Sequence, residues 1–136
     1  MPERLLLPAD PSSIARARHW VAALGRRAHV GPSAEHTLEL LTSEVLTNAI
    51  VHTGASAPIS VRADLRQDAV RVEVTDTDTT MPVVRPASAT RAGGNGMRIV
   101  EMLASTWGVD VHPGAGKTVW FEARVGATLR TALLGA

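Results

Sequence analysis

The sequence predicts a single α+β domain, a two-layer α/β sandwich in which helices cover one face of a mostly antiparallel, mixed sheet. The chain has 136 residues, which is enough for one domain. Its first half carries apolar residues at helical spacing, and its later stretches alternate apolar and polar residues. Strands that alternate in this way have one buried and one wet face, so we expect the helices to cover the buried face.

The composition favours a folded globular protein over a disordered, membrane-spanning or nucleic-acid-binding one. Hydrophobic residues make up 45% of the chain and charged residues 20%, as in proteins that bury a core. The 14 Lys and Arg residues nearly balance the 13 Asp and Glu residues, so we expect no direct nucleic-acid partner and no membrane-surface binding. The chain has no Cys, and no stretch approaches the ~20 apolar residues of a membrane span. We expect a soluble, cytoplasmic protein.

Two helices are expected in the first third of the chain. The first runs from Asp10 to about Ala28, with Pro11 as its first helical residue and Asp10 as its cap. Ser33 follows a Gly-Pro break and is expected to cap a second helix over residues 34–52. That helix is apolar on more than one side, so we expect it to be central.

Alternation with a period of two begins at Ile59. One strand is predicted from Ile59 to Leu65 and a second around Val70–Val74, with Gln67-Asp68 as the turn between them. Residues 76–93 show no sustained period, and a loop of this length inside a compact domain indicates a functional, lid-like segment. The remaining expected elements are a helix after Gly94-Asn95-Gly96, a strand around Trp107–Val111 and a strand around Thr118–Val125.

Two glycine-rich stretches resemble nucleotide-binding motifs. Residues 112–118 look like the end of a P-loop, but the motif's first glycine would fall on Val111, and a strand follows where the motif needs a helix. Gly94 and Gly96 lack the third glycine of a dinucleotide fingerprint. Two glycines before a helix still leave backbone N–H groups free for a phosphate, although a simple hinge is an alternative.

Polar residues that could bind a ligand or take part in catalysis occur on the predicted second helix and at the end of a predicted strand. Glu44, Asn48 and His52 are spaced four apart, so they form one row along the helix, beside Leu41. A carboxylate and an amide one turn apart can supply oxygens to Mg²⁺ and an acceptor for a nucleophile, or can form a satisfied hydrogen-bond network. Asp76 ends a strand, where it could accept a hydrogen bond from an exocyclic amine or simply start a turn.

The order of these features resembles the Bergerat-fold (GHKL) ATPases. Their N box, first glycine box, second glycine box and closing threonine correspond here to Glu44 with Asn48, Asp76, Gly94 with Gly96, and Thr118. Residues 40–52 and 116–122 look most like the stand-alone anti-sigma-factor serine/threonine kinases of actinobacteria. The resemblance covers almost the whole chain.

The resemblance implies an ATP- and Mg²⁺-dependent kinase of the Bergerat fold. Asn48 would hold the Mg²⁺ that bridges the phosphates, and Glu44 would be the catalytic base or orienting carboxylate. The substrate would be a serine on an antagonist protein, in a pathway in which partner proteins switch around a sigma factor. His52 matches a position that is often polar in these regulators, and no catalytic role follows for it.

The other motifs would bind the rest of the nucleotide. Asp76 would read the adenine amino group, and Thr118 would support the adenine side near it. Gly94 and Gly96 would form a lid over the phosphates. The first glycine box departs from its usual D-x-G-x-G pattern, because Thr77 to Thr80 contain no glycine.

This departure keeps two alternatives open. The chain could be a binding module of the same fold that sequesters a sigma factor or antagonist with little or no catalysis. It could also be a detached histidine-kinase catalytic domain. A homodimer is a further expectation, because relatives tend to pair and Trp120 falls on the wet face of its strand, although an edge or a loop could cover it.

Overall fold

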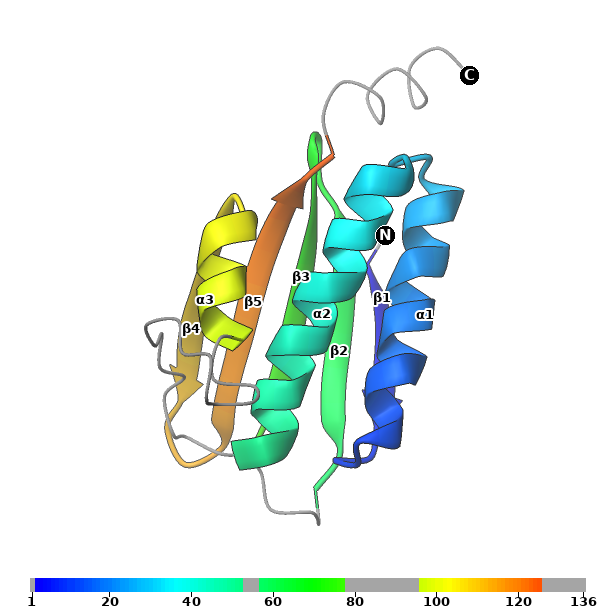
Figure 1. Cartoon of the computed structure of the whole chain (residues 1–136). Coiled ribbons are helices and arrows are strands. Elements are labelled where there is room, and N and C mark those ends of the chain that lie inside the picture. The colour runs from blue at the N-terminus through cyan, green and yellow to red at the C-terminus, as the bar shows by residue number, and fades with distance from the viewer. Residues whose placement is uncertain (1, 53–56, 78–95, 126–136) are drawn as a thin grey trace, which may run out of the picture.

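A computed structural model describes residues 2–52, 57–77 and 96–125. It has an α+β fold with helices on one face of a five-stranded sheet, which confirms the expected fold class (Figure 1). The elements are β1 (Glu3–Leu7), α1 (Ser12–Arg27), α2 (Pro32–His52), β2 (Ile59–Leu65), β3 (Ala69–Asp76), α3 (Gly96–Leu103), β4 (Thr106–His112) and β5 (Gly116–Arg124). The sheet order is β1-β2-β3-β5-β4, and every pair of neighbours is antiparallel, so no mixed part occurs among the described strands.

Strand β1 is an element that the sequence pattern did not predict. It pairs with β2 at the edge of the sheet, where Leu5 lies opposite Val61 and Leu7 opposite Ile59. Leu7 is buried, whereas Leu6 is 63% exposed. Three consecutive leucines therefore alternate between the two faces, and their shared hydrophobicity hides the period of two.

The helix starts follow proline and glycine. Helix α1 is preceded by Pro11 in helical conformation, and the Asp10 carboxylate accepts hydrogen bonds from the Ser12 N–H at 3.4 Å and from its hydroxyl at 3.0 Å. Helix α2 begins at Pro32, and the Gly31 carbonyl accepts the first helical hydrogen bond, from the Glu35 N–H at 3.0 Å. Ser33 is therefore inside the helix and is not its cap, because Pro32 takes the first helical position.

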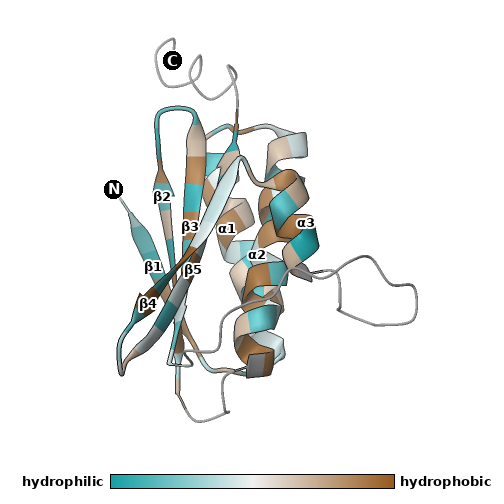
Figure 2. Ribbon diagram, turned by 90° about the vertical axis from the view of Figure 1, so that its left-hand side faces the viewer, coloured by the Kyte–Doolittle hydropathy of each residue, from teal (hydrophilic) through white to brown (hydrophobic). Residues whose placement is uncertain are grey.

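The core lies between the helices and one face of the sheet. Figure 2 shows the sheet on one side and the three helices on the other, with the second sheet face uncovered by any described helix. Helix α2 is central, as expected, and packs against α1, α3, β3 and β5. Fully buried side chains from these layers include Leu38, Leu41, Val72, Val119 and Phe121.

The hairpins follow the predicted alternation closely. Strands β2 and β3 are joined through a turn in which the Arg66 N–H donates to the Ala69 carbonyl at 2.8 Å. Strands β4 and β5 each extend beyond the predicted bounds at their joining turn. The expected lid over residues 76–93 lies, from residue 78 onward, outside the described residues. Among the described helices, none is long and apolar enough to cross a membrane.

Candidate functional site

Four chain segments that are distant in sequence converge on one end of the sandwich. Helix α2 and strand β3 end there, and strand β5 and helix α3 begin toward it (Figure 1). The antiparallel pairing of β3 with β5 places Asp76, the last residue of one strand, opposite Lys117, near the start of the other. This end of the molecule carries the expected site residues Asn48 and Asp76.

Glu44 and Asn48 lie one turn apart on α2, at the edge of its buried stripe. Leu41 and Val45 beside them are fully buried, whereas Glu44 and Asn48 are half-buried, as the helical spacing predicted. Burial raises the pKa of the Glu44 carboxyl above its ordinary value. A carboxylate whose pKa is raised is a better proton acceptor, which suits a group that orients or deprotonates a hydroxyl.

The Asn48 amide nitrogen is buried and has no hydrogen-bond partner among the described residues. A buried donor without an acceptor is uncommon, because it loses its hydration without compensation. A phosphate oxygen would satisfy the amide nitrogen, and the amide oxygen could ligate a divalent cation. Within the described part of the chain, no cluster of three or more His, Cys, Asp or Glu side chains could hold a metal ion.

Asp76 and Lys117 form an ion pair in the interior, which we call the buried pair. The Lys117 ammonium donates to both oxygens of the Asp76 carboxylate, at 3.2 Å each. Both side chains are 0% exposed, and Lys117 is among the largest fully buried side chains in the described structure. Charged residues are almost never fully buried unless they are paired, so each of these charges depends on the other.

Thr118 does not lie beside the Asp76 carboxylate, contrary to the sequence expectation. Its hydroxyl is on the opposite face of the sheet, within hydrogen-bond distance of the Thr75 hydroxyl at 2.7 Å and of His112 Nε2 at 2.8 Å. Neighbouring residues of a strand point to opposite faces, so Lys117 takes the place on the Asp76 side. The sequence contained a signal for the position of Lys117, because residues two apart on a strand point to the same face, and Lys117 is in step with the buried Val119 and Phe121.

A glycine fixes the start of β5 against the end of β3. Gly116 has φ of 106°, and a Cβ added there would lie 1.9 Å from the Asp76 carbonyl oxygen. Glycine is therefore needed for both the backbone conformation and the close approach. The result is that Lys117, the next residue, is held directly across from Asp76.

The remaining expected site residues are only partly described. Gly96 is the first residue of α3, as the predicted helix start required, and Met97 after it is buried. Gly94 lies outside the described residues, so its lid role is untested. His52 is the last residue of α2.

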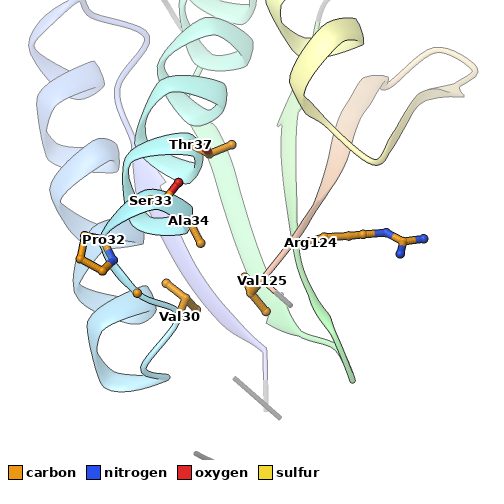
Figure 3. A pocket seen from close by; sticks show the side chains of 8 residues that line it. Val30, Pro32, Ser33, Ala34, Thr37, Arg124 and Val125 are labelled. Atoms are coloured by element: carbon orange, nitrogen blue, oxygen red, sulfur yellow. The ribbon is translucent and has the colours of Figure 1, made fainter. Parts of the chain in front are cut away.

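A hollow of about 500 Å³ lies away from these residues, where α2 begins and β5 ends. Figure 3 shows its lining side chains, which come from the connection between α1 and α2, the start of α2, and the end of β5 with the residue that follows it. Arg124 is the one ionisable side chain among the residues that line it. The hollow therefore lacks the acid and amide chemistry found at the other end of α2.

Comparison with known proteins assigns the fold to a family. Residues 7–122 match the family described as the histidine kinase-like ATPase domain. The chain belongs to this family. An uncharacterised protein of Streptomyces coelicolor is 37% identical over 71 residues, which are 50% of this chain and 68% of that protein.

A solved structure supports the fold of this histidine kinase-like ATPase domain. It is the histidine kinase domain from the Erythrobacter litoralis EL346 blue-light activated histidine kinase, with a TM-score of 0.53 and 18% identity. The match covers 94% of this chain but 65% of the other chain. Membership of a family described as an ATPase domain implies ATP binding.

The two halves of the site differ in how well they fit Mg²⁺ and ATP. The half-buried Glu44 carboxylate and the Asn48 amide, whose nitrogen has no partner among the described residues, offer donors and acceptors suited to a cation and a phosphate. Asp76, by contrast, does not present a free carboxylate to a base, because both of its oxygens receive the Lys117 ammonium. Glu44 and Asn48 therefore fit the phosphates of a nucleotide, whereas Asp76 in this conformation does not fit its base.

Proposed function

We propose that this histidine kinase-like ATPase domain is an ATP-dependent protein serine/threonine kinase of the anti-sigma-factor type. Its substrate would be a serine on an antagonist protein in a partner-switching transcription pathway. The observation that carries the proposal is that Glu44 and Asn48 lie half-buried and one turn apart on α2. Burial raises the pKa of the Glu44 carboxyl, and the Asn48 amide nitrogen has no hydrogen-bond partner among the described residues. The family match supports the nucleotide, and the sequence resemblance supports the serine acceptor.

Asn48 and Glu44 would have different roles in phosphotransfer. Mg²⁺, when bound, would neutralise charge on the phosphates, and Asn48 is the residue that would hold it. Glu44 would accept or orient the proton of the incoming serine hydroxyl. Positioning and charge neutralisation contribute most to this class of reaction, so a site with few ionisable groups can perform it.

The test is transfer of labelled phosphate from Mg-ATP to a serine-bearing antagonist of the partner-switching class. We expect acid-stable phosphate on serine with the wild-type chain, and a loss of at least about 100-fold in rate with Glu44→Gln. Glu39→Gln is the matched control, because Glu39 is on the same helix about 140° around its axis. Acid-labile phosphate would instead indicate a histidine acceptor. No transfer with the wild-type chain would remove the kinase proposal.

A second candidate function is a binding module that sequesters a sigma factor or an antagonist without catalysis. The buried pair favours it, because Asp76 is engaged within the protein. The lack of glycine in residues 77–80 favours it as well. Calorimetric titration with Mg-ATP separates the two candidates, since micromolar binding favours the kinase and no detectable binding favours the module.

A further inference from the structure

Lys117 lies where a nucleotide base would need to engage Asp76. The carboxylate has the role, by resemblance, of accepting the adenine amino group, and an ammonium from the protein's own chain already donates to both of its oxygens. An amino group of a base and a lysine ammonium are both hydrogen-bond donors, so they compete for the same acceptor. The ammonium carries a full charge and makes the stronger hydrogen bonds.

The surroundings leave the base no place beside the pair. Both side chains are 0% exposed, so no solvent-accessible surface of the carboxylate remains. The backbone is equally tight, because Gly116 lies so close to Asp76 and Thr77 that even a Cβ would not fit. A base can therefore reach Asp76 only after the Lys117 side chain has moved away.

We propose that Lys117 competes with the nucleotide base for Asp76. By occupying the Asp76 carboxylate, Lys117 lowers the affinity of this chain for the nucleotide. The proposal rests on the proposed function in one respect, namely that Asp76 is the base-reading residue. Nucleotide binding then requires Lys117 to leave Asp76, and any partner that draws Lys117 away would raise the affinity. Lys117 is a positioning residue here, since it acts through Asp76.

The chain offers a sharp test, because Lys117 is its single lysine. Mg-ADP binding is measured by calorimetry on the full chain for the wild type, Lys117→Thr and Lys117→Met, after circular dichroism has shown that each variant is folded. We expect Lys117→Thr to bind Mg-ADP at least about tenfold more tightly than the wild type. Lys117→Met removes the ammonium from Asp76 and leaves a flexible, uncharged side chain that a base can displace. If Lys117→Thr does not fold, we therefore expect a smaller gain in the same direction from Lys117→Met.

Arg71→Met is the matched control. Arg71 is also a cation held by carboxylates on the same sheet, but on the opposite face, so the variant loses the same charge without touching Asp76. We expect its affinity for Mg-ADP to stay within about twofold of the wild type. An equal gain in Arg71→Met would overturn the proposal, because it would indicate an effect of net charge.

The wild-type chain provides a measurement that needs no variant. A buried, hydrogen-bonded lysine ammonium gives an NMR signal, and a chain with one lysine gives one such signal. We expect saturating Mg-ADP to shift or remove it, and an unchanged signal would overturn the proposal.

The outcomes separate this proposal from the proposed function. If the wild type and Lys117→Thr bind Mg-ADP equally tightly, the proposal that Lys117 competes with the base is wrong, and nucleotide binding is still supported. If Lys117→Thr binds more weakly, Lys117 assists the base and the competition is again wrong. If no variant binds Mg-ADP, the nucleotide-binding function itself is wrong, and the competition falls with it.

Discussion

The two faces of the paired strands β3 and β5 hold charged side chains in opposite environments. On the helix-covered face, the buried pair of Lys117 and Asp76 is closed off from solvent. On the open face, Arg71 bonds Glu73 at 2.8 Å and Glu122 at 3.1 Å, and its guanidinium lies 3.9 Å from the centre of the Trp120 ring. These side chains all remain in partial contact with solvent.

One step along strand β5 decides whether a side chain lies in the core or on the open face of the sheet. Lys117 and Thr118 are neighbours, yet one is locked to Asp76 in the core and the other bonds Thr75 and His112 outside it. Exposed ion pairs contribute about 0–1 kcal/mol, whereas removing one partner of a buried pair costs about 3–5 kcal/mol. Position on the sheet, and not the type of residue, therefore sets how much each charge matters.

The largest expected effect comes from breaking the buried pair. Asp76→Asn leaves the Lys117 ammonium buried without its counter-charge, so we expect a loss of about 3–5 kcal/mol in the free energy of unfolding at neutral pH. The measurement is urea denaturation. The double variant Asp76→Asn with Lys117→Met removes both charges, and we expect it to recover most of the loss. A double variant no more stable than Asp76→Asn would show that the pairing is not what these residues contribute.

A backbone variant tests how the pair is held in place. Gly116→Ala would put a Cβ against the Asp76 carbonyl at a φ of 106°, so we expect a loss of at least about 2 kcal/mol. Gly114→Ala is the control, since Gly114 also has a positive φ, of 73°, but nothing lies within 4 Å of the added Cβ. Thermal unfolding that affects both variants equally would mean that only backbone conformation matters here.

The open-face network should respond more weakly. Desolvation opposes ionisation of Glu73, but the hydrogen bonds and charges of Arg71 and Arg62 outweigh it and lower the pKa of its carboxyl. A lowered pKa means that the carboxylate stabilises the fold above pH 4.5 and loses this contribution as the pH falls through its folded-state pKa. We expect Glu73→Gln to cost about 1 kcal/mol or less at pH 7. Denaturation at several pH values should show that the difference in the free energy of unfolding between the wild type and Glu73→Gln disappears below pH 4.5.

The smallest expected effect has the opposite sign. Burial raises the pKa of Glu44, so its ionised form opposes folding as the pH rises through the folded-state value. We therefore expect Glu44→Gln to be slightly more stable than the wild type at pH 7, by less than about 1 kcal/mol because the side chain is part-exposed. The gain should vanish below pH 4.5. A stability loss at pH 7 would show that the carboxylate makes a structural bond.

The sequence predicted the layers of the fold because alternation and helical spacing record burial directly. The β2–β3 strands and the span of α2 were readable for that reason. Strand β1 was not, since its leucines look alike on both faces. The site was readable where spacing along one helix fixes it, as for Glu44 and Asn48.

The pairing across strands was not readable from a motif alone. The motif pointed to Thr118, but register and parity place Lys117 on Asp76. The sequence does indicate which face each residue takes, because the alternation puts Trp120 on the solvent-facing side of its strand, and Thr118, two residues earlier, lies on the same side. The ion pair itself could not be predicted, since it depends on the three-dimensional register that sets Asp76 opposite Lys117.

An experimental structure of the chain with saturating Mg-ADP would show whether a nucleotide base displaces Lys117 from Asp76. We expect an adenine amino group within hydrogen-bond distance of Asp76, the phosphates on the side of Asn48, and Lys117 withdrawn from the carboxylate. A nucleotide bound elsewhere, with Lys117 still on Asp76, would contradict it.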